Sequence, residues 1–209
     1  MSSFSPSWLR WCSRLAAIAQ NGLTYAQNPY DIERYTSLRE IAAEMLAEGS
    51  GTSISTVLDL LSRESGYATP KVDVRGVVFR EDKLLLVQER ADGLWTVPGG
   101  WADVGESPME NVVREVREEA GLEVRPVKLL AVFDRSKHPH DPPLPYHVYK
   151  LFIRCDLVGG DLQAKTETLA AAFFAQSELP PLSVDRITAG QVQRLFEHHA
   201  NPALPTDLD

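Results

Sequence analysis

Apolar residues recur at helical spacing through the first third of the chain. They stand three or four positions apart in three groups, namely Trp8, Trp11, Leu15 and Ile18, then Leu38, Ile41 and Met45, then Ile54, Val57, Leu58 and Leu61. This spacing places each group on one face of an α-helix. Turn-forming residues at Asn28-Pro29 and at 49–51 separate the groups. Residues 7 to about 65 are therefore predicted to form three helices.

After Thr69-Pro70 the apolar residues follow the spacing of β-strands. Runs rich in β-branched and aromatic residues occupy 72–79, 84–87, 127–133, 146–155 and 169–174, with a tight turn at Glu81-Asp82. Helical spacing returns over about 108–120 and about 184–199, and Ser183 is the expected N-cap of the second helix. The pattern predicts a small all-α N-terminal domain (1–68), an α+β domain (69–200) and a mobile tail (201–209).

The composition is that of an ordinary folded protein. Of 209 residues, 44% are hydrophobic and 24% are charged, which favours a packed core over disorder. The 21 basic and 29 acidic residues give a net charge of −8. This balance argues against binding to DNA, but it is compatible with a small nucleotide held through a metal ion.

Cysteine usage and the apolar stretch 8–19 indicate the compartment. Cys12 and Cys155 are too few and too far apart for a disulfide framework or a zinc site, so both are predicted to be free thiols. Arg10 and Arg14 interrupt the stretch, which argues against a signal segment. No run approaches the roughly 20 apolar residues that span a bilayer. We expect a soluble, cytoplasmic protein that does not contact a membrane.

The helix expected near residue 110 carries three carboxylates on one face. Ser107-Pro108-Met109-Glu110 has the form of a capping box with proline at the first helical position, and Gly121 is suited to ending the helix. Glu115, Glu118 and Glu119 stand at positions i, i+3 and i+4. Like charges at this spacing repel, so a hard cation such as Mg²⁺ or Mn²⁺ is expected beside them. A solvated acidic face is the alternative.

The residues around these carboxylates form a longer motif. It runs Gly100, five residues, Glu106, seven residues, Arg114-Glu115-Val116, one residue, Glu118-Glu119, one residue, Gly121-Leu122. This order resembles the Nudix box, G-x5-E-x7-R-E-U-x-E-E-x-G-U with U an aliphatic residue, at every fixed position. An accidental match has odds on the order of 10⁻⁷. The resemblance implies the Nudix fold, a mixed β-sheet sandwiched between helices, and hydrolysis of a diphosphate bond.

The resemblance also implies roles for the residues of the box. Glu115, Glu118 and Glu119 would ligate Mg²⁺, with Mn²⁺ as a substitute, together with the carbonyl of Gly100. Glu115 has a second reading, in which it holds the attacking water. Arg114 resembles the arginine that orients these carboxylates. Glu106 either closes the loop before the helix or is only structural.

Many relatives use a further glutamate outside the box as a general base or an extra ligand. Glu167, just before the strand predicted at 169–174, is the candidate in this chain. Glu178 lies in Ser177-Glu178-Leu179-Pro180, which has the composition of an ordinary loop.

Two features outside the box are candidates for binding the rest of the substrate. The segment 134–140 follows a predicted strand and gathers four donors suited to phosphate or ribose, Arg135, Lys137, His138 and His140. A solvated loop is the alternative, and a zinc site is disfavoured because only His147 lies near as a third ligand. Trp101 is a candidate for stacking on a base at the rim of a cleft, whereas Trp95 is expected in the core.

The N-terminal residues add a second resemblance. Trp8-Leu9-Arg10-Trp11, Gly22-Leu23-Thr24-Tyr25, the segment 30–35 and the segment 70–75 resemble the helical extension of bacterial Nudix enzymes that act on X-linked nucleoside diphosphates. That subgroup includes hydrolases of ADP-ribose and of CDP-choline, the latter also acting on RNA. The products would be a nucleoside monophosphate and a phosphorylated partner. A nucleotide-sensing regulator without catalysis is the competing interpretation, which the intact set of carboxylates disfavours.

The first helix predicts self-association. Trp8, Leu9, Trp11, Leu15 and Ile18 form a wide apolar stripe near one end of the chain. A homodimer is expected, because burial against a second copy would compensate for the small core of a three-helix unit. The alternative is that the stripe folds back onto the Nudix domain of its own chain.

Overall fold

The structure is a computed structural model that describes residues 6–164, 166 and 168–209. Contacts within it divide the chain into two compact units, Met1–Pro70 with Pro143–His147, and Lys71–Pro142 with Val148–Asp209. Within the described ranges, none of the helices combines the length and the apolar character needed to cross a membrane.

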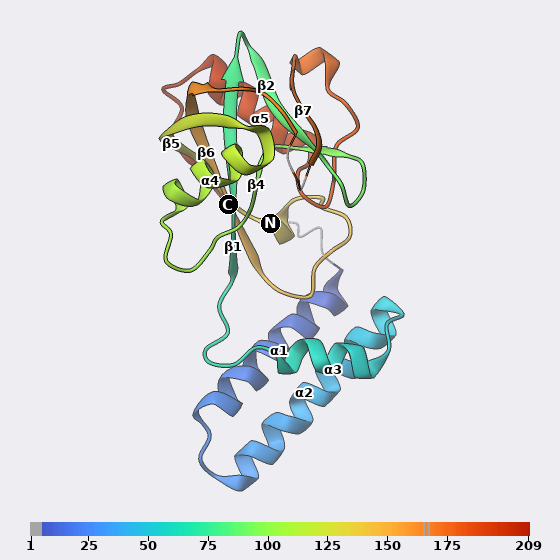
Figure 1. Ribbon diagram of the computed structural model, residues 1–209. Helices are drawn as coiled ribbons and strands as arrows, with labels where there is room; N and C mark the ends of the chain where they lie inside the picture. The colour runs from blue at the N-terminus through green and yellow to red at the C-terminus, as the bar shows by residue number, and fades with distance from the viewer. Residues whose placement is uncertain (1–5, 165, 167) are drawn as a thin grey trace. The chain divides into compact units, whose positions relative to one another are not determined.

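The first unit contains the three expected helices, α1 (Ser7–Tyr25), α2 (Pro29–Ser50) and α3 (Ile54–Ser62) (Figure 1). The side chains of Asn28 and Ser53 cap α2 and α3 by accepting hydrogen bonds from backbone N–H groups in the first turn of each helix. Gly51 follows α2 in the left-handed conformation, with φ of 69°. A small core joins the helices, formed by Leu9, Cys12, Ala43, Leu46, Ala47 and Val57.

The apolar stripe expected on the first helix divides between two sides of α1. Leu9 belongs to the core and Trp8 packs against it, whereas Trp11, Ile18 and Tyr25 are exposed. The three exposed residues follow one another at seven-residue intervals, about two helical turns, so they share one side of the helix. The stripe therefore supplies both a part of the unit's own core and an exposed apolar surface.

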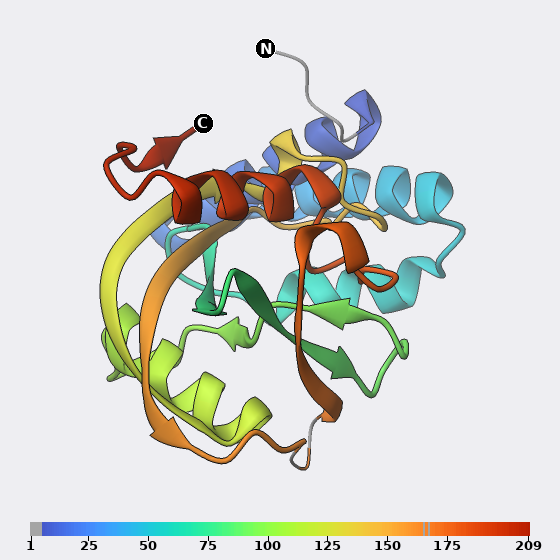
Figure 2. The same cartoon turned by 90° about the horizontal axis from the view of Figure 1, so that it is seen from above.

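The second unit is a mixed sheet with helices on both faces. Its strand order is β3-β2-β1-β6-β5-β8, with β4 paired to β1 and β7 paired to β2. The strands are β1 (Lys71–Arg80), β2 (Lys83–Glu89), β3 (Trp95–Thr96), β4 (Gly99–Trp101), β5 (Leu122–Asp134), β6 (Val148–Gly160), β7 (Thr168–Phe174) and β8 (Asp207–Leu208). Helices α4 (Pro108–Ala120) and α5 (Ala189–Ala200) cover opposite faces (Figure 2). The predicted fold class is confirmed.

Alternation along β1 distributes its side chains between the two cores. Val77 packs in the cluster that includes Val192 and Leu195 of α5, and Val78 packs with Val112 and Val116 of α4, as the period of two requires. Gly76 also faces α4, where an added Cβ would lie 2.6 Å from Val116. The sheet and α4 therefore approach each other closely at Gly76 of β1.

The C-terminal part differs from the sequence-based expectation in two places. Helix α5 begins at Ala189 and is capped by Thr188 in a capping box with Gln191, because Ser183 is instead buried and donates to Asp92 Oδ2 at 2.7 Å. The segment expected to be a mobile tail contains β8, which pairs with β5. Asp207 of β8 also accepts hydrogen bonds from the Arg194 side chain at 2.6 and 2.7 Å. Hydrogen bonds made across the fold hold this segment in place.

Candidate active site

The helix of the box is set by its own residues. The Ser107 side chain accepts from the backbone N–H of Glu110, and the Glu110 side chain accepts from the backbone N–H of Ser107, so the expected capping box is present. Gly121 ends α4 in the left-handed conformation, with φ of 72°. The apolar face packs on the sheet through Val112, Val116 and Ala120. Glu115 and Glu119 are carried on this side and are buried.

Two glycines bring the backbone of β4 next to these carboxylates. Gly99 has φ of +137°, and an added Cβ would lie 2.0 Å from the carbonyl oxygen of Val74, so only glycine fits there. Its N–H donates to Glu119 Oε2 at 2.9 Å. An added Cβ on Gly100 would lie 3.5 Å from Glu115 Oε1. The Glu115 and Glu119 carboxylates and the Gly99-Gly100 backbone therefore meet at one place.

The electrostatics of this place favour a cation. Burial, together with the neighbouring negative charges of Glu115 and Glu89, raises the pKa of Glu119 to about 8, against the opposing effect of the Arg75 guanidinium. Burial also raises the pKa of Glu115, although Arg114 opposes the change. Buried carboxylates that lack sufficient counter-charge match the oxygen ligands preferred by a hard divalent ion.

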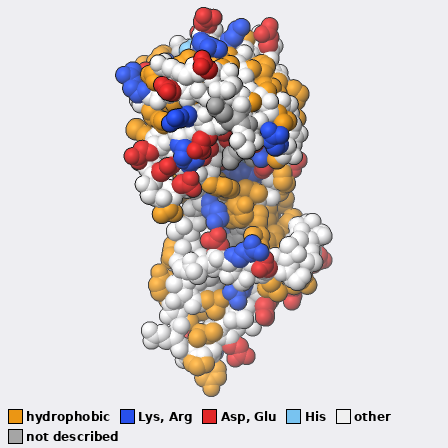
Figure 3. Space-filling view, viewed as in Figure 1, with side chains coloured by type: hydrophobic (Ala, Val, Ile, Leu, Met, Phe, Trp, Pro, Cys, Tyr) orange, Lys and Arg blue, Asp and Glu red, His pale blue; other side chains and the backbone are white. Residues whose placement is uncertain are grey.

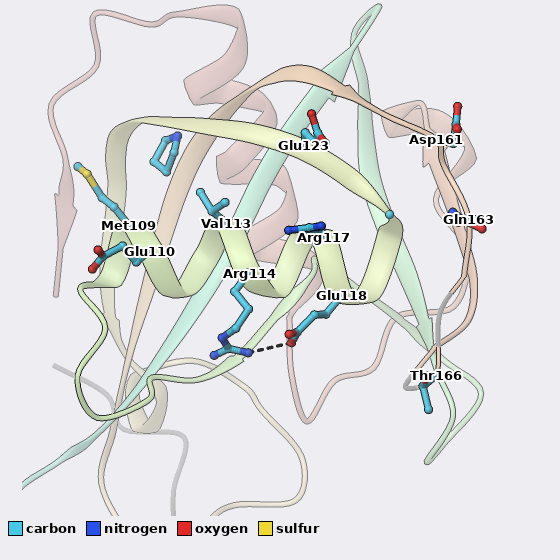
Figure 4. A pocket seen from close by; sticks show the side chains of 12 residues that line it. Met109, Glu110, Val113, Arg114, Arg117, Glu118, Glu123, Asp161, Gln163 and Thr166 are labelled. Carbon is cyan, nitrogen blue, oxygen red and sulfur yellow. Dashed lines mark hydrogen bonds and ion pairs between the residues drawn. The ribbon is translucent and has the colours of Figure 1, made fainter.

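Arg114 joins the acidic residues on the outer side of the box. It donates to Glu106 at 3.1 and 3.2 Å, to Glu118 at 2.9 Å and to Asp103 at 2.7 Å. It also forms an ion pair with Glu115 at 3.0 Å. Figure 4 shows the contact with Glu118, and acidic and basic side chains lie close together on the face of this unit drawn in Figure 3. Arg114 therefore contacts four acidic side chains, and its orienting role stays a prediction. Glu106 contacts it from the loop before α4.

The predicted metal ligands are only partly brought together. The Glu118 side chain is 54% exposed and paired with Arg114, whereas Glu115 adjoins Gly100 and Glu119 accepts from the Gly99 N–H. Within the described ranges, no three Asp, Glu, His or Cys side chains converge as a ready metal site. Glu167, the candidate base, lies outside the described residues. Glu178 is exposed in the short helix η2 (Gln176–Glu178).

Several buried charges beside the site were missed by the sequence analysis. Arg75 donates to both carboxylate oxygens of Asp73 at 2.8 and 2.7 Å, and Lys150 donates to Asp73 Oδ1 at 2.7 Å. All three side chains are buried. Burial lowers the pKa of Lys150 to about 8, although Asp73 opposes the change. The available signal was the alternation of charged residues at Lys71, Asp73 and Arg75, on one side of the predicted strand.

Arg135, His138 and His140 of the segment 134–140 contact acceptors of their own chain. Arg135 and His140 are buried, with Arg135 paired to Asp185 at 2.6 Å and His140 Nδ1 2.8 Å from the Val184 carbonyl oxygen. His138 Nε2 lies 3.2 Å from Asp209. Lys137 is half-buried in the short helix η1 (Arg135–Lys137).

The two tryptophans near the box differ in exposure. Trp101 is 47% exposed on β4, and its stacking on a base stays a prediction. Trp95 packs against the α5-side core, with its ring centroid 4.8 Å from that of Phe174. Trp95 is therefore partly buried at the edge of the core.

A groove of about 1170 Å³ runs along the outer side of α4 (Figure 4). Its lining includes Met109, Val113, Arg117 and Glu123. Neither Glu115 nor Glu119 is among its lining residues, so this groove does not contain the paired buried carboxylates.

Comparisons with known proteins agree with this geometry. The family model described as NUDIX domain matches residues 69–195, and the one described as UDP-X-like, N-terminal oligomerisation domain matches residues 6–61. The Bacillus subtilis protein YjhB, provisionally named an ADP-ribose pyrophosphatase, is 47% identical over 209 residues, which are 100% of both chains.

Two solved structures are also similar. A crystal structure of an ADP-ribose pyrophosphatase from Streptococcus suis is 45% identical with a TM-score of 0.61, covering 68% of this chain and 100% of that chain. A crystal structure of a UDP-X diphosphatase is 34% identical with a TM-score of 0.63, covering 100% of both chains. The chain belongs to the Nudix family. It is a hydrolase of pyrophosphate bonds, in a family that generally uses a divalent cation.

Proposed function

We propose that this enzyme hydrolyses the diphosphate bond of a nucleoside diphosphate linked to another group, with ADP-ribose as the first candidate substrate and Mg²⁺ as the cofactor. The observation that carries the proposal is the meeting of two buried carboxylates, Glu115 and Glu119, with the Gly99-Gly100 backbone. Relatives named as ADP-ribose pyrophosphatase and UDP-X diphosphatase support this class of substrate.

Each residue of the site has its own proposed role in the reaction. Glu115, Glu119 and the carbonyl of Gly100 would hold Mg²⁺, with Glu118 joining after it leaves Arg114. When bound, the ion neutralises the diphosphate and favours attack by water. Arg114 holds the surrounding carboxylates in place, and Trp101 offers its exposed ring to a base. Glu167 is our candidate for the base that takes a proton from water.

The bond changes define the products. The water oxygen bonds to one phosphorus, the bridging oxygen leaves with the other phosphate, and the proton of the water passes to the base. ADP-ribose would give AMP and ribose 5-phosphate.

A substrate panel with and without Mg²⁺ tests the proposal. It contains ADP-ribose, CDP-choline, nucleotide sugars and a short RNA. We expect turnover of at least one linked nucleoside diphosphate, abolished by a chelator, with both phosphorylated products. Inorganic phosphate as the primary product contradicts the bond assignment. Tight nucleotide binding without any turnover would instead favour a nucleotide-sensing regulator.

We also propose that the helical domain, residues 1–68, pairs two copies of the chain. The match to a family described as an oligomerisation domain supports this, and so does the exposed stripe of Trp11, Ile18 and Tyr25 on α1. Because a two-fold interface uses the same patch on both copies, one substitution affects it twice.

Sedimentation tests the pairing. The full chain should sediment near twice its mass of 23.2 kDa. Ile18→Glu should return it to the monomer, whereas Ile54→Glu on α3 should not, although the two residues are similarly exposed at 50% and 49%. A wild-type monomer at micromolar concentration contradicts the proposal.

A further inference from the structure

The segment 134–140, here called the β5–β6 loop, is held in place by hydrogen bonds to residues far away in sequence. Arg135 Nη2 donates to the carboxylate of Asp185 at 2.6 Å and to its carbonyl oxygen at 3.2 Å. His140 Nδ1 lies 2.8 Å from the carbonyl oxygen of Val184. Val184 and Asp185 thus hold both ends of the short stretch between Arg135 and His140.

A second fastening comes from Asp209. The backbone N–H of Asp134 donates to Asp209 Oδ2 at 2.6 Å, and His138 Nε2 lies 3.2 Å from Asp209 Oδ1. His138 also packs on Phe133, with ring centroids 4.5 Å apart. Asp209 therefore holds the start and the middle of the loop, in addition to the contacts made by Val184 and Asp185.

The register of the sheet places this loop at the same end of the sheet as Gly99 and Gly100 of β4. Asp73 pairs with Trp101 of β4 and with Lys150 of β6, and Lys150 pairs with Phe133 of β5. Trp101 and Phe133 are therefore separated by three strand spacings of about 4.8 Å, roughly 14 Å in all. The β5–β6 loop begins at Asp134, one residue after Phe133. It therefore starts at the end of the Trp101–Asp73–Lys150–Phe133 row that is opposite to Trp101.

The contacts within the protein occupy the polar groups of Arg135 and His140 that would otherwise bind a substrate. A guanidinium that already donates to Asp185 can grip a phosphate only in competition with that carboxylate. The His140 imidazole must donate through Nδ1 to contact a carbonyl, which leaves Nε2 as an acceptor, and acceptors repel phosphate oxygens. Both side chains are buried. Their contacts hold the loop in one position before any substrate arrives, which lowers the cost of binding.

We propose that Arg135 and His140 are positioning residues, and that the Arg135–Asp185 pair sets the affinity for the group linked to the nucleoside diphosphate by holding the β5–β6 loop in place. The inference rests on the proposed function, because it assigns the loop to the same substrate. It differs from the simpler interpretation that Arg135 contacts a phosphate itself.

A double-mutant cycle separates the two interpretations. Arg135→Met, Asp185→Asn and the double variant are assayed with ADP-ribose at saturating Mg²⁺. We expect each single variant to raise KM about tenfold, as for loss of one charged hydrogen bond, with kcat changed less than about twofold. The double variant should be no worse than the more severe single variant, since both single variants remove the same Arg135–Asp185 ion pair. Asp185 is 40% exposed, so its substitution keeps the test valid if Arg135→Met folds poorly.

The Arg125–Asp156 pair serves as the matched control. It joins β5 to β6 at 3.0 Å. The side chain of Asp156 is 41% exposed, which is nearly the same exposed fraction as the 40% of Asp185. Its variants should leave KM unchanged. A rise in KM for Arg135→Met without one for Asp185→Asn would show that Arg135 contacts the substrate, and it would overturn the proposal.

Hydrogen exchange of residues 134–142 gives a second readout that does not depend on turnover. Both single variants should lose protection there. If protection is lost while KM stays constant, the loop does not set affinity and the proposal fails. If the wild type hydrolyses no member of the panel, the proposed function fails, whereas unchanged exchange in both variants would independently refute the fastening.

Discussion

The Nudix box and the β5–β6 loop both gather charged residues, yet the structure uses them in opposite ways. In the box, Glu115 and Glu119 are buried beside the Gly99-Gly100 backbone. In the loop, Arg135 and His138 face Asp185 and Asp209 of the same chain. The two carboxylates lack sufficient counter-charge, whereas the Arg135 guanidinium has a carboxylate partner. Charge left uncompensated inside a fold is therefore the better sign of a ligand site.

The largest effect that sharpens this contrast is expected from Glu119→Gln. The amide keeps the shape of the side chain and removes the ligand charge, so kcat should fall at least roughly 10²-fold, since losses around a metal site alone cost about 10 to 100-fold. The measurement is Mg²⁺-dependent hydrolysis of ADP-ribose. Glu123→Gln, an exposed residue of the outer groove, is the control. Turnover near the wild-type rate in a chelator-sensitive assay would remove Glu119 from the metal site.

A smaller effect is expected from Arg114→Met. The change releases Glu106, Asp103 and Glu118 from their shared partner, so kcat/KM should fall about tenfold or more. Arg114→Lys should recover only part of the loss, because an ammonium cannot reproduce the guanidinium fork. Arg117→Met, one turn along α4, should keep wild-type activity. Equal losses in the two methionine variants would mean that the damage is general to the helix.

The smallest effect concerns the pH dependence of stability without metal. The pKa of Glu119 is raised from 4.5 to about 8, so the folded state holds a proton that the unfolded state releases between these values. The free energy of unfolding therefore falls as pH rises through this window. We expect the Tm of the metal-free protein to fall by several degrees relative to Glu119→Gln between about pH 5 and about pH 8.

Comparison with the glutamine variant cancels other titrations. Burial lowers the pKa of His140 to about 3, which makes stability rise with pH up to its unfolded value near 6.5. This slope is common to both proteins. Parallel Tm curves for the two proteins would contradict the raised pKa of Glu119. Adding Mg²⁺ at pH 8 should raise the wild-type Tm and leave the variant almost unchanged.

The sequence was sufficient for features that depend on neighbours along the chain. The capping box and Gly121 delimit α4 locally, and helical geometry places Glu115 and Glu119 together because they are four residues apart. The three N-terminal helices and their breaks also follow from local residues. The same spacing did not place Glu118, because its flexible side chain pairs with Arg114 instead.

Only the tertiary structure decided which way the charged groups outside the helix face. Arg135 pairs with a residue 50 positions later, and the tail is held by pairing with β5, so no local pattern contains either partner. The buried row of Asp73, Arg75 and Lys150 likewise depends on the parallel register of β1 and β6. Local periodicity determines the face of an element on which a side chain lies, whereas burial and ion pairing depend on the element packed against it.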